Sequence, residues 1–174
     1  RGQHISDAPD SLDVISMMYP AELAAFELVD MQTVHAKGTK VVYTISFDKI
    51  QKEYTEKVKE GTETGSFDTY LKSEMDKQIG YAGSFDGMIT EYKGNNPIYM
   101  SAEQKAEAKK YQDIFFSAVL TWKTANADKL LTFQGYPENL IEQTILTNCK
   151  HIILATDNVT DDAQLSVFAR LAMA

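Results

Sequence analysis

Few side chains in this sequence combine the types and the spacing that enzymatic chemistry needs. The histidines are His4, His35 and His151, and no two are three or four residues apart, the spacing that lets a helix hold a metal ion. The single cysteine, Cys149, is close to His151 but lies on an apolar stripe, where a thiol is usually buried and inert. Nucleotide-binding, kinase and hydrolase motifs are absent. The sequence therefore predicts no metal, no cofactor and no catalytic residue by motif.

An enzyme can also assemble its site only in the fold, without a local signature. Such a site would bring acid–base groups together from distant parts of the chain. The groups of this kind to inspect are Glu22, Asp48, Glu91, Asp157 and His151. An enzyme without a local signature is the alternative interpretation, and it requires several of these side chains to converge in one cleft.

The segment from residue 80 to residue 99 combines aromatic side chains with four of the nine glycines. Tyrosine and phenylalanine on irregular backbone give a large contact area at a low cost in conformational entropy. We therefore predict that Tyr81, Phe85, Tyr92 and Tyr99 form a partner-binding surface on an exposed loop or short hairpin. The competing interpretation is that these rings close one edge of the hydrophobic core.

Charge limits the classes of partner. The net charge is −8, and the only arginines are Arg1 and Arg170, so the chain lacks the basic face that nucleic acid requires. No apolar run approaches the length of a membrane-spanning helix. Because the chain opens with an arginine, we expect processing, and an exported or periplasmic location is slightly favoured over a cytoplasmic one. The main interpretation is a non-enzymatic binding or assembly protein that associates with another protein or with itself.

Hydrophobic periodicity predicts the elements that must position these residues. Ser101 and Gln104 have the spacing of a capping box and open a helix to about residue 127, apolar nearly all round near its middle and therefore central. Residues 40–47 alternate as a strand, and residues 88–92 form a possible second one. Further helices are expected near 11–32, 48–60, 66–79, 138–153 and 160–172. The apolar run 151–156 is compatible with the end of a helix or with a buried strand.

These elements predict a mainly α, α+β fold: about six helices around the central helix at about 101–127, with a small sheet of one to three strands. Residues 1–10 are expected to be a flexible lead-in and residues 11–174 a single globular domain. Trp122 is expected to be buried at the centre, against the stripe of Ile141, Ile145 and Ile152.

Overall fold

The computed structural model describes residues 4–157 and 161–172. Its centre is a sheet of five parallel strands that follow the chain in the order β1-β2-β3-β4-β5. The strands are β1 (Val14–Met17), β2 (Lys40–Ser46), β3 (Gly87–Tyr92), β4 (Leu130–Gly135) and β5 (His151–Leu154). Because neighbouring strands are parallel, the chain must return after each strand to the edge of the sheet at which all strands begin.

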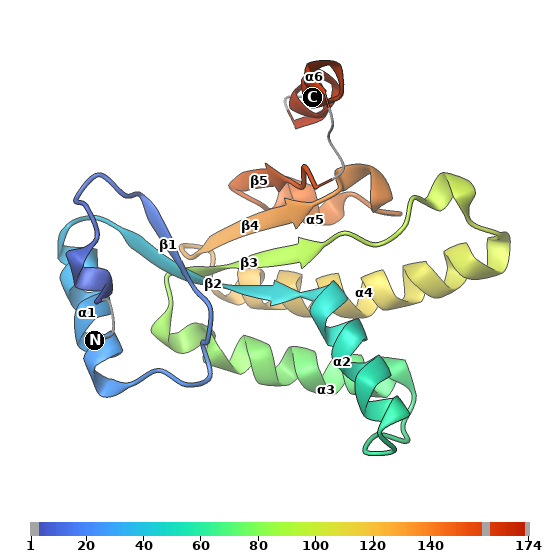
Figure 1. The fold of residues 1–174 in the computed structure, drawn as a ribbon, viewed down its shortest axis with the longest axis horizontal. Coiled ribbons are helices and arrows are strands. Elements are labelled where there is room, and N and C mark those ends of the chain that lie inside the picture. Colours follow the sequence, from blue (N-terminus) through green and yellow to red (C-terminus); the bar gives the residue numbers. More distant parts are fainter. Residues whose placement is uncertain (1–3, 158–160, 173–174) are drawn as a thin grey trace.

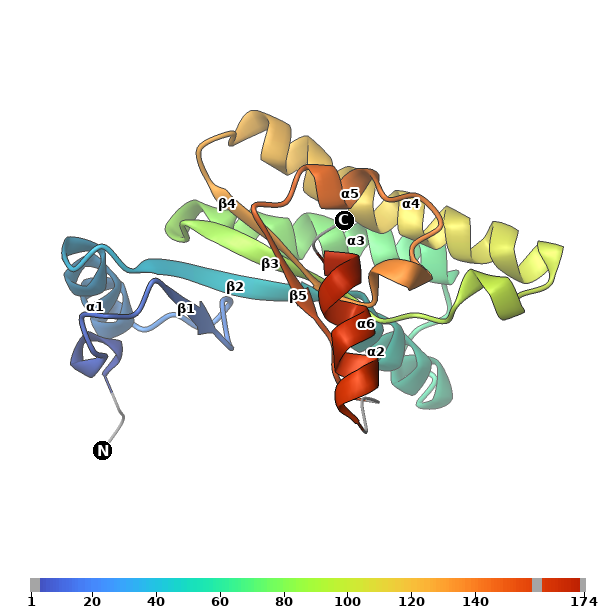
Figure 2. The same ribbon diagram turned by 90° about the horizontal axis from the view of Figure 1, so that it is seen from above.

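Helices make most of these returns. The α-helices are α1 (Ala25–Ala36), α2 (Phe47–Lys59), α3 (Phe67–Ile79), α4 (Ala102–Ala125), α5 (Thr144–Thr147) and α6 (Asp162–Ala172). Short 3-10 turns are η1 (Ile5–Asp7), η2 (Gly80–Ser84), η3 (Pro97–Tyr99) and η4 (Pro137–Asn139). Figure 1 shows α3 and α4 side by side beneath the sheet, and both views place α1 beside the start of β2 and α2 beside its end (Figures 1 and 2). The result is a curved half-barrel of βα units.

The prediction of a mainly α fold with one to three strands is therefore wrong. β4 was not predicted, and the segment around β1 was predicted to be helical because Leu12, Ile15 and Met18 are three residues apart. The expected helix over 138–153 is also wrong: α5 is the only α-helix there, after the 3-10 turn η4. For the run from residue 151, β5 confirms the strand alternative. β1 and β5 are edge strands of only four residues, and apolar runs this short cannot be distinguished from pieces of helix by their pattern.

Other predicted elements are confirmed. The strand expected at 40–47 is β2, and the short strand expected at 88–92 is β3. The helix from Ser101 is α4, and the Ser101 hydroxyl accepts a hydrogen bond from the Gln104 amide at 3.2 Å while the Gln104 side chain accepts one from the Ser101 amide at 2.9 Å. The Thr160 cap expected for the last helix lies outside the described residues.

One face of the sheet packs against the helices. Alternate strand residues enter the core there together with the buried sides of α3 and α4, among them Val41, Tyr43, Ile45, Met88, Tyr92, Leu131, Phe133, Leu71, Met75, Phe115 and Val119. Because side chains alternate along a strand, the residues between them point to the opposite, concave face. Thr44 and Ser46 of β2, Glu91 of β3 and Gln134 of β4 belong to that face.

Near the amino terminus, His4 and Ser6 both hydrogen-bond the Asp30 carboxylate of α1, at 2.8 and 3.0 Å. The flexibility of residues 1–10 and the single-domain organisation stay predictions.

No helix in the described ranges is long and apolar enough to cross a membrane.

Trp122 is buried, as predicted, with 8% of its surface exposed. A surface hollow beside its ring is lined by Met75 and Ile79 of α3, whereas Ile141 and Ile145 line a different hollow with Phe116. Trp122 therefore shares this hollow with α3, and its packing against the isoleucine stripe stays a prediction.

Replacing Trp122 by alanine is expected to lower the free energy of unfolding by about 3–5 kcal/mol, because the change leaves a cavity between α3 and α4. Urea unfolding followed by circular dichroism measures the loss. Thr121→Ala, at an exposed position next to it, is the control and should stay within about 0.5 kcal/mol of the unaltered protein. Equal stability of the two variants would contradict this packing.

Candidate functional site

The carboxyl ends of parallel strands meet at one edge of a sheet, and active sites of α/β folds are built at that edge. In the strand register, Ser46 pairs with Glu91, Glu91 with Gln134, and Gln134 with Ile153. These four residues therefore form one row across β2, β3, β4 and β5. Glu91 lies in the middle of the row and accepts a hydrogen bond from the Gln134 side-chain amide at 3.1 Å. The row places a half-buried carboxylate at the carboxyl edge of the half-barrel.

An ion pair connects the loops that follow β3 and β5. The Lys93 ammonium donates a hydrogen bond to the Asp157 carboxylate, and both side chains are partly exposed. This hydrogen bond raises the pKa of Lys93, and the negative charges of Asp157 and Glu91 add to the rise. Lys93 is therefore charged at neutral pH, and its positive charge acts on Glu91.

The loop after β3 is fixed from two sides. The Asp48 carboxylate accepts a hydrogen bond from the Lys93 backbone amide at 2.9 Å. The Asn139 side-chain amide donates to the Lys93 carbonyl at 2.6 Å and to the Gly94 carbonyl at 3.1 Å. Asp48 is available for this because Ser46, not Asp48, caps α2 by accepting a hydrogen bond from the Lys49 amide. Asp48 and Asn139 thus position the loop that carries Lys93.

Gln112 ties the central helix to this edge. It is buried on α4, and its amide nitrogen donates to the Tyr92 hydroxyl at 2.9 Å and to the Asn139 carbonyl at 3.1 Å. Its oxygen accepts from the Ile141 backbone amide at 2.9 Å. One side chain therefore satisfies three polar groups and holds the end of β3 and the segment after β4 in place.

Gln112→Met is expected to cost about 2–4 kcal/mol of unfolding free energy, because it fills a similar volume but leaves these three polar groups without their partner. Thermal unfolding measures the effect. Lys105→Met, at an exposed position of the same helix, should change stability by no more than about 0.5 kcal/mol. If Gln112→Met and Lys105→Met are equally stable, the hydrogen bonds of Gln112 do not stabilise this edge of the sheet.

The structure brings together three of the five acid–base groups singled out in the sequence. Asp48, Glu91 and Asp157 all lie at or just beyond the carboxyl ends of β2, β3 and β5. His151 begins β5 and so lies at the opposite edge, and Glu22 is exposed in the segment between β1 and α1.

Gln134 and Asn139 were not found from the sequence, and for Lys93 the sequence predicted a place on the rim of a partner-binding surface and no role in catalysis. The signal that points to them is positional: a polar residue at or just after the end of a short apolar run, as in Glu91-Tyr92-Lys93 and in Phe133-Gln134. That signal is usable only once the strands are known.

Cys149 does not contribute a nucleophile. Burial raises the pKa of its thiol to about 12, so the reactive thiolate is scarce at neutral pH. Within the described ranges, no group of three or more histidine, cysteine or acidic side chains is placed to hold a metal ion.

The four predicted aromatic residues do not share one surface. Phe85 and Tyr92 are buried, with 3% of each exposed, and Tyr81 is half-buried in η2. Tyr99 is 87% exposed. The expected exposed loop or hairpin is wrong for residues 87–92, because they form the central strand β3. Partner binding by these residues stays a prediction.

The fold has a counterpart among solved structures. The chain superposes on the crystal structure of an endo-beta-N-acetylglucosaminidase from Cordyceps militaris, in apo form, with a TM-score of 0.63 and 14% sequence identity. The match covers 99% of this chain and 58% of that one, so this chain spans little more than half the length of its structural counterpart. At this identity the likeness shows the fold alone. No curated protein sequence matches the chain.

The family follows from the sequence. Residues 1–174 match glycoside hydrolase family 18, BT1044-like, and the chain belongs to that family. This finding overturns the interpretation as a non-enzymatic binding or assembly protein and the expectation that the protein is not an enzyme. It favours the alternative, an enzyme whose site is assembled only in the fold.

Proposed function

We propose that this protein is a glycoside hydrolase whose reacting centre includes the concave edge formed by the ends of β2, β3, β4 and β5. The observation that carries the proposal is the row Ser46–Glu91–Gln134, with a half-buried carboxylate at its middle. A carboxylate at the carboxyl end of a barrel strand is the typical position of a catalytic group in this architecture.

Glycosidic bond cleavage passes through a transition state with positive charge on the sugar ring. In family 18 the substrate assists its own cleavage, so the protein need not supply the nucleophile. An ionised carboxylate beside the sugar then stabilises the positive charge and accepts hydrogen bonds from the substrate. This is the role that we assign to Glu91.

Two polar groups act on Glu91. The Gln134 amide donates a hydrogen bond to it, and the Lys93 ammonium lies close enough for their charges to interact. A carboxylate held in this way can oppose positive charge on the sugar ring and orient the substrate, and these are the roles that we assign to Glu91.

For the substrate, we propose a glycan that contains β-linked N-acetylglucosamine and is cleaved within the chain of sugars. The activity named for the structural counterpart, an endo-beta-N-acetylglucosaminidase, supports this choice.

The test is to incubate the full-length protein with defined oligosaccharides and to follow new reducing ends by mass spectrometry. Oligomers of β-linked N-acetylglucosamine and N-glycans with an N-acetylglucosamine core should be cut between sugars, and a glucose oligomer of equal length should stay intact. Cleavage of the glucose oligomer alone would contradict the proposed substrate class, and cleavage of none would contradict the proposed activity.

A further inference from the structure

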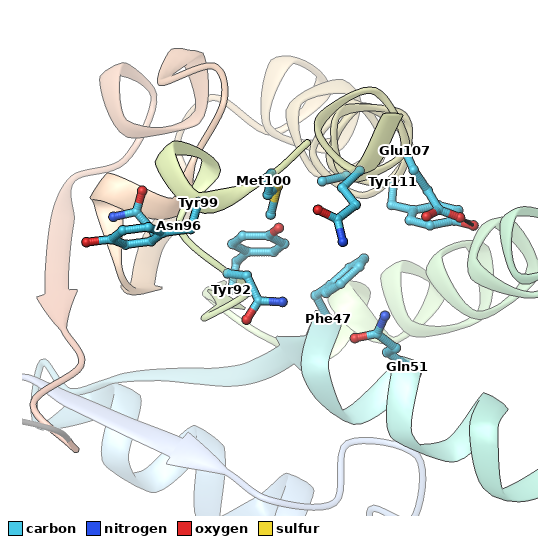
Figure 3. A pocket seen from close by; sticks show the side chains of 12 residues that line it. Phe47, Gln51, Tyr92, Asn96, Tyr99, Met100, Glu107 and Tyr111 are labelled. Carbon is cyan, nitrogen blue, oxygen red and sulfur yellow. Dashed lines mark hydrogen bonds between the residues drawn. The ribbon is translucent and has the colours of Figure 1, made fainter. Parts of the chain in front are cut away.

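A pocket of about 500 Å³ lies at the end of β3, on the side of the sheet that carries the helices (Figure 3). Its walls come from the start of α2, the last residue of β3, the loop over residues 94–100 and the first half of α4. The volume is within the range of roughly 300–1,000 Å³ that ligand pockets have. This pocket is distinct from the row around Glu91, because Tyr92, which lines it, points to the opposite face of the same strand.

Aromatic rings form the floor of the pocket. Figure 3 shows Phe47 and Tyr92 near its middle, with Met100 above Tyr92 and Gln51 below Phe47. The Phe47 and Tyr92 ring centroids are 5.0 Å apart, and the Tyr92 hydroxyl is held by Gln112. Both rings are buried members of the core, so this floor is rigid before a ligand arrives.

The wall formed by the loop approaches this floor closely. A side chain at Gly94, whose φ is +49°, would place its Cβ 2.5 Å from the Tyr92 ring. Glycine is therefore required for the loop to lie against the aromatic floor.

Besides the tyrosine hydroxyls, the polar side-chain groups of the pocket are neutral amides and one carboxylate. The amides belong to Gln51, Asn95, Asn96 and Gln104, and the carboxylate belongs to Glu107. Among the described residues that line the pocket, none is a lysine, an arginine or a histidine. Anionic ligands such as phosphates need cationic or charge-assisted donors, so this lining disfavours them. Side-chain amides both donate and accept hydrogen bonds, as sugar hydroxyls do.

We propose that this pocket binds a neutral sugar unit of a glycan, at a site separate from the reacting edge. A sugar ring has apolar C–H faces that fit against aromatic rings and a rim of hydroxyls that fits the amides. Tyr99 lines the pocket, is 87% exposed and can cover the bound sugar with its ring. The choice of N-acetylglucosamine as the probe sugar rests on the proposed function.

The position of the pocket next to the row around Glu91 indicates how one glycan could occupy both sites. Glu91 and Tyr92 are consecutive residues on opposite faces of β3, and the loop that follows them lines the pocket with Gly94, Asn95 and Asn96. A branched or extended glycan can then be held on both sides of this loop, with one part in the pocket and the scissile bond beside Glu91.

The experiment is NMR titration of the full-length protein, carrying Glu91→Gln so that the probe is not consumed, with a trimer of β-linked N-acetylglucosamine. Saturable shifts are expected for the backbone amides of Gly94, Asn95 and Gln104. Tyr99→Ala should weaken binding at these resonances about tenfold, by removing an aromatic contact. Ile98→Ala is the matched control, since Ile98 belongs to the same turn, is 83% exposed and does not line the pocket. Inorganic phosphate is the second probe and should produce no saturable shift.

Each outcome decides the proposal. It is overturned if the trimer leaves the pocket resonances unchanged, if Tyr99→Ala and Ile98→Ala bind it equally well, or if phosphate saturates the same resonances. The proposed enzymatic function is judged separately, by cleavage. If the protein cleaves glycans but shows no shifts at the pocket, the proposed function stands and this inference is overturned. If the pocket resonances shift but no glycan is cleaved, this inference stands and the proposed function is contradicted.

Discussion

Glu91→Gln is expected to lower kcat for glycan cleavage about 10²–10³-fold, the scale of removing one group that stabilises charge in a transition state. Glutamine keeps the size of the side chain and its contact with Gln134, but it has no negative charge to oppose the positive sugar ring. The measurement is steady-state kinetics on the glycan that the unaltered full-length protein cleaves. KM should change much less than kcat, because the lost interaction is strongest in the transition state.

Glu60→Gln is the control for this prediction. Glu60 is exposed at the end of α2, far from the row in the sheet, and its replacement should leave both constants unchanged. If Glu91→Gln retains full kcat while Glu60→Gln behaves normally, Glu91 is not the carboxylate that stabilises the transition state.

The second large effect is on folding. Gly135→Ala is expected to destabilise the protein by about 4 kcal/mol or more, or to prevent folding, since a Cβ at this position would lie 1.8 Å from the Tyr92 carbonyl oxygen. The backbone at Gly135 also has a φ of +145°, a conformation that other residues rarely adopt. The clash occurs where β3 and β4 pair, directly beside Glu91 and Gln134.

Chemical unfolding and the yield of folded protein measure this effect. Gly83→Ala is the matched control, because a Cβ at Gly83 meets nothing within 4 Å and its φ is not positive. A Gly135→Ala protein as stable as Gly83→Ala would contradict the strand spacing at the reactive edge.

The sequence was informative where local chemistry decides the structure. The Ser101–Gln104 capping box correctly predicted the start of α4, and alternation correctly predicted β2. The sequence was misleading where the sheet decides the structure. Residues 14–17 and 130–135 are short apolar runs that become strands only because they pair with β2 and β3, and that pairing has no local pattern.

The candidate site was predicted only in part, for a related reason. Glu91, Asp48 and Asp157 were named as acid–base groups to inspect, but so were Glu22 and His151, and nothing in the chain ranked them. Their grouping depends on which strand ends share an edge, so it required the parallel order of the sheet. The absence of a local motif does not exclude chemistry in this chain, because the polar groups at the carboxyl edge come from the ends of separate strands.

The most direct test of the central claim is a crystal structure of the full-length Glu91→Gln protein with an intact oligosaccharide of β-linked N-acetylglucosamine. We expect the scissile sugar to lie over the Ser46–Glu91–Gln134 row, with a polar atom of that sugar within hydrogen-bond distance of the side chain at position 91. An intact sugar chain bound elsewhere on the protein, with the row open to solvent, would contradict the assignment of this edge as the reacting centre.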